Sequence, residues 1–156
     1  MDLQPLFQAF EDTALGVVIK RSIWIFPVIQ CVHLLGLALL GGTVIAVDMC
    51  MLGLGLSTQP SAELSRKLRP WMTGALVTTV ISGFLMFLSE AIKCYFSPPF
   101  WYKMTFLLVA TLFAYTIRRN VAESVDTSPM KVKLAAVVSL ALWFGVGFSG
   151  RWIAFY

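Results

Sequence analysis

The chain has 156 residues, of which 58% are hydrophobic and only 13% are charged. Soluble domains average about 25% charged residues, so this composition excludes a disordered chain and argues against an ordinary soluble domain. Twelve Lys and Arg residues against eight Asp and Glu residues give a net charge of +4. In a membrane protein such an excess mostly sets orientation, so we do not interpret it as a sign of nucleic-acid binding. The single histidine excludes any site built on several histidines.

The first segment, residues 3–20, has the pattern of an amphipathic helix. Leu6 and Phe7 represent its apolar side, and Gln8 and Glu11 represent its polar side. No basic stretch leads into a short apolar core, so we do not expect a signal peptide here. We expect an N-terminal interfacial helix that lies on the bilayer.

Four long apolar segments follow, and each is long enough to cross a membrane. A spanning helix needs about 20 mostly apolar residues, and its backbone groups must be paired within the segment. These segments are continuous rather than alternating, which disfavours a transmembrane β-barrel. The spans are expected near residues 23–52, 71–94, 100–118 and 132–154. The sequence therefore predicts an all-α fold, an integral membrane four-helix transmembrane bundle formed by a single domain, residues 1–156.

The connectors between the spans carry residues that stop helices. The run GLGLSTQP from Gly53 to Pro60 is typical of a helix end. SAELSRKLR follows it and predicts a short polar helix that Pro70 ends. Ser-Pro-Pro at 97–99 separates the second span from the third, and residues 124–129 separate the third from the fourth.

The Lys and Arg residues predict the orientation of the bundle. With four spans, both termini and the 94–100 loop lie on one side of the membrane. The opposite side holds more Lys and Arg residues, in tight clusters on short loops, and is therefore expected to be cytoplasmic. We expect a multi-pass protein of the bacterial inner (cytoplasmic) membrane with both termini in the periplasm. The terminal side holds Lys20, Arg21, Lys93, Lys103 and Arg151, and the opposite side holds Arg66, Lys67, Arg69, Arg118, Arg119, Lys131 and Lys133.

His33 is the main candidate for chemistry. It lies about 15 Å into the first span by helical rise, and an ionisable residue inside a span is a functional candidate. The alternative is a neutral imidazole that is hydrogen-bonded to Gln30, Ser82 or a backbone carbonyl. At about 100° per residue, one broad face of this span contains His33 and should look into the bundle. That face comprises Gln30, His33, Leu37, Leu40, Gly41, Val44 and Asp48.

Three further charged residues lie in or beside the spans. Asp48 is about 22 Å from His33 by helical rise, too far to be its partner. We expect it to pair with Arg66 or Arg69, and a proton path or a metal-entry site is the alternative. Lys103 and Arg151 flank the third and fourth spans on the predicted outer side. They either form surface ion pairs or form a ring that neutralises the carboxylates of a cofactor entering from outside.

The sulfur-containing and small residues allow two interpretations each. Met86 and Met104 lie toward the outer half, where they either pack or supply a soft axial ligand opposite His33. Glycines in the first, second and fourth spans either allow close helix packing or leave room for a flat cofactor. No CxxC motif is present, so we expect free structural thiols at all three cysteines, Cys31, Cys50 and Cys94.

Several motifs resemble known membrane families. They are VHLLGLALLGGTVIAVDMCMLGL, RKLRPWMTGALVTTVISGFLMF, FWYKMTFLLVATLFAY and GRWIAFY, one from each span in chain order. Together they resemble an uncharacterised family of small bacterial four-helix integral membrane proteins over nearly the whole chain. The HLLG…GG start and the WYKM of the third span are also distantly similar to the CopD copper-resistance domain and to the four-helix bacterial protoporphyrinogen oxidase.

The distant resemblance implies a role for two residues. In those relatives an early-span His serves heme or redox-metal chemistry and a third-span Lys lies near the site. These roles would fall on His33 and Lys103. No second His is present, so the bis-histidine heme of b-type cytochrome bundles cannot form.

These observations lead to one functional hypothesis and two alternatives. The leading hypothesis is a membrane redox protein that binds heme b through His33 and takes part in electron transfer. One alternative is a non-catalytic accessory subunit of a larger membrane complex, with aromatic and glycine faces that dock partner helices. The other is a copper-handling membrane protein that uses His33 with Met86 or Met104. The expected partners are the lipid bilayer and possible membrane-protein partners or a homo-oligomer, with no nucleic acid.

Overall fold

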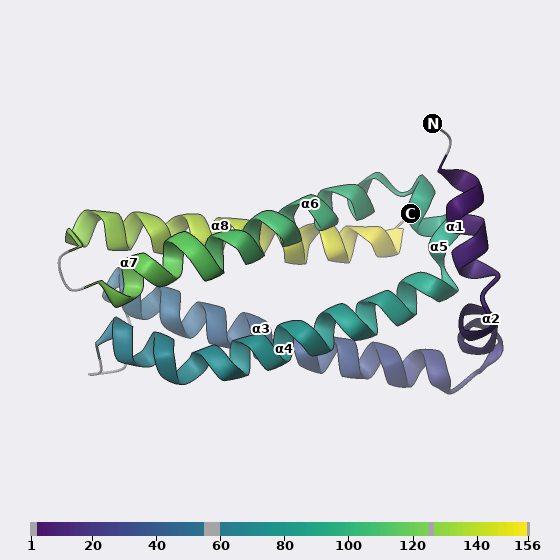
Figure 1. The fold of residues 1–156 in the computed structure, drawn as a ribbon, viewed down its shortest axis with the longest axis horizontal. Helices are drawn as coiled ribbons and strands as arrows, with labels where there is room; N and C mark the ends of the chain where they lie inside the picture. The colour runs from purple at the N-terminus through teal and green to yellow at the C-terminus, as the bar shows by residue number, and fades with distance from the viewer. Residues whose placement is uncertain (1–2, 55–59, 125–126, 156) are drawn as a thin grey trace.

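Four long helices, each apolar enough to cross a membrane, run side by side in the structure (Figure 1). A computed structural model describes residues 3–54, 60–124 and 127–155. All regular elements within these ranges are helical, so the predicted all-α bundle is confirmed. The long helices are α3 (Ile25–Leu52), α4 (Ser61–Ser89), α6 (Pro98–Phe113) with its continuation in η1 (Ala114–Arg118) and α7 (Arg119–Glu123), and α8 (Pro129–Trp152).

The long helices pack as two antiparallel pairs. α3 packs along α4, α6 packs along α8, and α3 also contacts α8. Both chain ends lie at one end of the bundle, together with the short helices α1 (Gln4–Glu11), α2 (Ala14–Arg21) and α5 (Ala91–Phe96) (Figure 1). We call this the capped end, and we call the opposite end, where α3 stops and α8 starts, the loop end.

The end of the first span follows the prediction. Gly53 is the C-cap of α3 and has φ 78°, a left-handed conformation that glycine adopts without a steric penalty. Its N–H donates to Cys50 O and the N–H of Leu54 donates to Met49 O, each at 3.0 Å. This is the glycine-terminated helix end that the sequence indicates. Residues 55–59 of the predicted connector lie outside the described residues.

The second span differs from the prediction at its start. Pro70 does not end a separate polar helix, because α4 runs without interruption from Ser61 to Ser89 with Pro70 inside it. A proline removes one backbone donor and leaves the carbonyl four residues earlier without its helical partner. That carbonyl belongs to Arg66, only one turn and a residue from the helix start. The loss is therefore confined to the polar end of α4, and the helix continues.

The third span contains a π-helical turn. η1 is a π-helix between α6 and α7, and a π-turn inserts one extra residue into a helical turn. The insertion keeps one row of residues facing the bundle across the junction, and every member of this row is buried. The row consists of Ala110, Ala114, Arg118 and Ala122.

The N-terminal segment forms a cap rather than one interfacial helix. The expected helix over residues 3–20 is divided at Asp12 and Thr13, because the Thr13 hydroxyl accepts the N–H of Gly16 at 3.2 Å and so starts α2. α1 packs on α5 and α2 packs on the end of α4. A Cβ on Gly16 would lie 2.6 Å from Leu88 O, so only glycine permits this approach.

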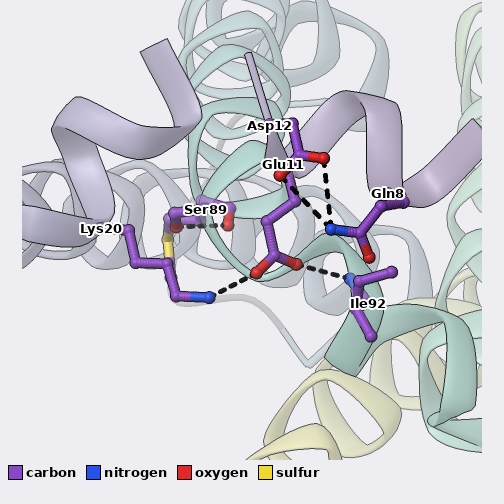
Figure 2. A network of polar contacts seen from close by, with 7 residues as sticks. Gln8, Glu11, Asp12, Lys20, Ser89 and Ile92 are labelled. Carbon is purple, nitrogen blue, oxygen red and sulfur yellow. Dashed lines mark hydrogen bonds and ion pairs between the residues drawn. The ribbon is translucent and has the colours of Figure 1, made fainter. Parts of the chain in front are cut away.

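Aromatic and polar contacts hold the cap on the bundle. Phe7 lies 5.4 Å from Phe87, 5.2 Å from Tyr95 and 6.0 Å from Trp101, measured between ring centroids. Glu11 accepts the backbone N–H of Ile92 at 3.0 Å and also pairs with Lys20, as Figure 2 shows. The cap is thus attached through both rings and charges.

The buried residues differ between the two halves of the bundle. The apolar core occupies the middle and the loop half, in two clusters centred on Leu40 with Val44 and on Val47 with Met51. In the capped half the buried side chains are mainly polar or small. The buried polar residues of the capped half are His33, Thr79, Ser82, Ser89, Ser97 and Ser149.

Candidate functional site

His33 lies in the capped half, on the side of α3 that faces α4. Only 7% of its surface is exposed. Its Nδ1 lies 3.0 Å from Ser82 Oγ on α4, and the ring also interacts with the backbone of Thr79, so two of the three alternatives that the sequence left open, Ser82 and a backbone carbonyl, are present. Of the expected inward face, His33, Leu40, Val44 and Asp48 are buried, whereas Leu37 and Gly41 are half-buried and Gln30 is exposed.

The hydrogen bonds of Ser82 assign the proton of the imidazole. The single hydroxyl proton of Ser82 is donated to its own helix, to Thr78 O at 2.6 Å or Thr79 O at 3.3 Å. Ser82 Oγ must therefore accept from His33, which places the imidazole proton on Nδ1. With the proton on Nδ1, the lone pair of the ring is on Nε2.

Glycines lie beside His33 and Lys103. A Cβ at Gly83 would lie 3.1 Å from His33 Cε1 and 3.5 Å from Nδ1, so this edge of the ring lies against α4. On the other helix pair, the side chain of Lys103 packs on Gly150 of α8, with its Cε 3.5 Å from where a Cβ would lie. Gly83 thus gives room to the His33 ring, whereas a Cβ at Gly150 would make only ordinary contact with Lys103.

Lys103 brings a positive charge into the capped half. It is half-buried, and it lies close enough to both His33 and Cys94 for electrostatic interaction. No carboxylate of the described residues lies within ion-pair distance of its Nζ. A half-buried cation without a carboxylate is suited to an anionic ligand.

Cys94 of α5 closes this region toward the cap. Burial raises the pKa of its thiol from 9.0 to about 11, against the opposing effect of the Lys103 charge. The thiol is therefore neutral at physiological pH and does not compensate the charge of Lys103. All three cysteines are free, as predicted.

The other predicted site residues occupy different surroundings. Arg151 is exposed, and its guanidinium lies 5.3 Å from the ring centroid of Phe155 instead of turning inward beside Lys103. Met86 is half-buried one turn beyond Ser82 on α4, whereas Met104 exposes 46% of its surface. Lys103 is thus within electrostatic range of His33, whereas the guanidinium of Arg151 lies on Phe155.

Two buried hydroxyl groups near the site have no partner. Thr79 Oγ1 and Ser97 Oγ are buried and form no hydrogen bond within the residues that the structure covers. Thr79 is on α4 one turn before Ser82 and Gly83, and Ser97 joins α5 to α6. Buried polar groups are normally paired, so such atoms mark a place for water or for a polar ligand.

A second polar centre lies in the loop half and corrects one prediction. Asp48 pairs neither with Arg66 nor with Arg69, because its Oδ1 accepts Nε–H of Arg118 at 2.5 Å. Arg118, which the sequence placed in a cytoplasmic cluster, is 4% exposed. The row of buried alanines on this span carries it inward, and burial of both partners makes their pairing obligatory.

All the long helices contribute to this ion pair. Arg118 also donates to Val44 O of α3 at 3.4 Å and reaches Met72 Sδ of α4 at 3.7 Å. Ser139 of α8 is fully buried beside the carboxylate of Asp48, but neither its hydroxyl nor Asp48 Oδ2 forms a hydrogen bond within the described residues. Beside the pair is a cavity of about 20 Å³, enough for one water molecule. The alternative of a proton path or metal-entry site remains an expectation.

Arg69, the other expected partner of Asp48, is engaged elsewhere. It pairs with Glu123, which also lies 3.9 Å from Arg119. A signal for the true partner of Asp48 is present in the sequence, because Arg118 is the only charged residue in a row of alanines spaced four apart. Small residues on one face of a span indicate the packed face, and a charge on it must find a buried partner.

Comparison with known proteins gives one match. The model of a protein family described as "Family of unknown function (DUF6644)" matches residues 6–156. No curated protein and no solved structure matches the chain. The distant similarity to CopD and to protoporphyrinogen oxidase therefore rests on the short motifs alone.

Proposed function

We propose that this chain, which belongs to the DUF6644 family, is a membrane redox protein that binds heme b through His33 and takes part in electron transfer. The observation that carries the proposal is the state of the imidazole. Its Nδ1 lies 3.0 Å from Ser82 Oγ, and with Nδ1–H donated to Ser82 the lone pair on Nε2 would be available to a metal. Histidines that bind metals almost always donate their other ring N–H in this way.

The neighbouring residues fit a heme by their chemistry. A neutral imidazole is a common heme ligand, and Lys103 supplies a cation for a propionate carboxylate. The unpaired hydroxyl groups of Thr79 and Ser97 offer further polar contacts. Met86, half-buried on α4, is the better shielded of the two candidate thioether ligands.

Each residue would have a distinct role in this function. Bound heme supplies one-electron chemistry. Ser82 fixes the orientation of the His33 ring, and Lys103 attracts and holds the anionic side of the ligand. The cap and the buried apolar side chains exclude water from the bundle, which strengthens the interaction of Lys103 with an anion.

Absorption spectroscopy of the purified protein tests the proposal. Wild-type protein from heme-sufficient cells should show a Soret band, and His33→Ala should lose it while keeping its helical circular dichroism and its elution volume. Gln30→Ala is the matched control, because Gln30 lies one turn from His33 on the same helix but is exposed. A colourless wild-type protein would overturn heme binding, and so would a His33→Ala variant that keeps its colour.

A second candidate is a non-catalytic accessory subunit of a larger membrane complex. Gly42 and Gly147 favour this function, since both are exposed and a Cβ on either would meet no neighbouring atom within 4 Å. Small residues on a lipid-facing surface let partner helices approach closely. Co-purification of a stoichiometric membrane partner, lost in a Gly147→Leu variant, together with an absent Soret band, would favour this function.

Copper handling is the remaining alternative. No group of three or more His, Cys, Asp or Glu side chains that could hold a metal occurs among the described residues. A copper site would therefore depend on His33 with a thioether such as Met86. Metal analysis of the same protein samples distinguishes copper from iron.

We also propose that both termini are periplasmic and that the membrane is the bacterial inner membrane. The tight Lys and Arg clusters at the loop end support this orientation. Ala14→Cys at the capped end and Ser128→Cys at the loop end, both exposed, suit labelling in a background without native cysteines. A membrane-impermeant reagent should label position 14 alone in whole cells, and labelling of position 128 alone would invert the orientation.

A further inference from the structure

An apolar groove runs along the outside of the α3–α4 pair. Its volume is about 380 Å³, within the range of about 300–1,000 Å³ for small-molecule sites. Gly36 and Ala75, both buried, form the floor. Leu35, Leu39 and the exposed ring of Trp71 form the sides.

Small residues keep this groove open. Gly74 lines it, and a Cβ there would meet no atom within 4 Å. Pro70, Gly74 and Thr78, spaced four apart on α4, all line the groove. The same spacing continues to Arg66, one turn toward the loop end. Arg66 and Thr78 are separated by about 18 Å along the helix, close to the thickness of one leaflet, about 15 Å of hydrocarbon.

Arg66 differs from the other cations near it. It is exposed, and its Nε donates to Ala62 O at 3.4 Å, which leaves the two terminal nitrogens of the guanidinium available. Among the described carboxylates, none lies within ion-pair distance of Arg66. The remaining basic residues on α4, η1 and α7 all have a carboxylate partner, in the pairs Lys67–Glu63, Arg69–Glu123, Arg118–Asp48 and Arg119–Glu123.

We propose that this groove is a binding site for an anionic phospholipid, with one acyl chain in the groove and the phosphate on Arg66. The apolar walls match a hydrocarbon chain, and the guanidinium matches a phosphate oxygen pair. The exposed indole of Trp71 lies beside the groove, where amphipathic rings meet the headgroup region. The site is independent of the heme proposal, because it lies on the lipid-facing side of the α3–α4 pair.

Quenching of Trp71 by brominated lipids tests the site. The full chain is placed in phosphatidylcholine nanodiscs with increasing brominated phosphatidylglycerol or brominated phosphatidylcholine, and the Trp71 signal is the difference between wild type and Trp71→Phe. We expect half-quenching at an about fivefold lower fraction of the anionic lipid, the gain that one cation near an anionic headgroup gives.

Three variants identify the parts of the site. Arg66→Gln should abolish the preference for the anionic lipid, and Gly74→Leu should reduce quenching by both lipids because leucine fills the open groove. Lys131→Gln removes an exposed cation at the same end of the bundle, on α8, and should change neither. Equal quenching by both lipids in the wild type would overturn the proposal, as would equal effects of Arg66→Gln and Lys131→Gln.

One further outcome assigns the groove to another occupant. If light scattering shows that wild-type protein is a dimer and that Gly74→Leu is a monomer, with no lipid preference in either, the groove is an interface between two copies. That result also overturns lipid binding.

Discussion

The two halves of the bundle differ in whether a charged side chain within them has a partner of opposite charge. In the loop half, the Arg118 guanidinium and the Asp48 carboxylate neutralise each other and lie within an apolar core. In the capped half, Lys103 has no carboxylate partner within the described residues. The first centre is neutral as a pair, although Asp48 Oδ2 and Ser139 Oγ have no hydrogen-bond partner within the described residues, whereas the second carries a cation without a carboxylate partner.

This difference separates a structural centre from a candidate binding centre. A buried ion pair is costly to assemble but strongly destabilising to break, so it fixes how the helices fit together. Unpaired cations and hydroxyl groups are costly as well, and a protein keeps them where a ligand or water satisfies them. The comparison therefore supports a structural role for the loop half and makes the capped half the candidate for binding a ligand.

The largest expected effect comes from breaking the ion pair on one side. Arg118→Leu leaves the carboxylate of Asp48 buried without a partner, which should cost about 3–5 kcal/mol of unfolding free energy. Unfolding in mixed micelles with increasing dodecyl sulfate measures this loss.

Two further variants show that the loss comes from the pair. Arg119→Leu removes the neighbouring exposed arginine, 3.9 Å from Glu123, and should cost less than about 1 kcal/mol. The double variant Asp48→Leu with Arg118→Leu removes both charges and should recover most of the lost stability. The comparison fails if Arg118→Leu costs no more than Arg119→Leu.

The thiol of Cys94 tests whether the capped half is dry. Burial raises the pKa of this thiol to about 11, so its reactive thiolate should be about 100-fold scarcer at pH 7.5 than that of a thiol with the usual 9.0. Alkylation of a variant that retains only Cys94 should therefore be slow and should accelerate about tenfold per pH unit up to about pH 11.

A cysteine introduced at the exposed neighbouring position, 93, provides the reference thiol. Lys93→Cys, in a background without native cysteines, lies on the same short helix but faces solvent. Its alkylation rate should level off near pH 9. A Cys94 rate that levels off at the same pH would show that water reaches the capped half freely.

Removal of the His33 partner tests the tautomer. Ser82→Ala deprives Nδ1–H of its acceptor, and loss of such a partner weakens metal affinity about 10–100-fold. Heme titration followed at the Soret band should show this decrease. Ser89→Ala is the control, because Ser89 is equally buried on α4 but bonds only to Met86 O. Equal heme affinity in both variants would show that the contact between His33 and Ser82 does not contribute to ligand binding.

The sequence predicts the spans because it contains long apolar runs, and it places Gly53 because a left-handed helix end needs glycine. It also predicts the burial of His33 and offers Ser82 as a partner. The sequence does not predict that α4 continues through Pro70. A proline near a helix end removes a hydrogen bond at little cost, and a local pattern does not show how far the helix extends on either side.

The charged contacts could be predicted only in part. The count of Lys and Arg residues at each end of the bundle treats Arg118 as a surface residue, because the sequence position of a residue does not show how deeply its side chain is buried. Its partner Asp48 is separated from it by 70 residues, and only the packing of α3 against η1 brings them together. The division of the N-terminal segment at Thr13 comes from a local cap on Gly16, which the amphipathic pattern does not show. The contact that attaches this segment to the bundle joins Glu11 to an N–H of α5, 81 residues away, and no local pattern indicates it.

The smallest expected effect concerns the cap, which connects the capped half to solvent. Its key side chain is Glu11, held between Lys20 and the N–H of Ile92 (Figure 2). The hydrogen bonds from Lys20 and from the Ile92 backbone lower the pKa of the Glu11 carboxyl below 4.5, whereas the bond to Glu11 raises the pKa of Lys20 above 10.5. The ionised pair is therefore intact between these two values.

The pH dependence follows from the sign of each shift. A carboxyl group with a lowered pKa stabilises the folded state above its unfolded value, and this contribution is lost as the pH falls through the folded value. Acidification below pH 4.5 should thus loosen the cap, by at most about 1 kcal/mol because Lys20 is half exposed. A second loss is expected above pH 10.5, where Lys20 loses its proton.

Amide exchange at Ile92 reports the attachment of the cap directly. Its N–H should exchange faster than the intrinsic pH dependence of exchange accounts for once the pH falls through the lowered pKa of Glu11, and Glu11→Gln should show the fast behaviour at neutral pH as well. Asp12→Asn is the control, because Asp12 is exposed and accepts only from Gln8, at 3.3 Å. If Ile92 stays equally protected in Glu11→Gln, the rings around Phe7 hold the cap without the charges. The capped half would then be closed by the same apolar packing as the loop half, and the contrast between the halves would be restricted to His33 and Lys103.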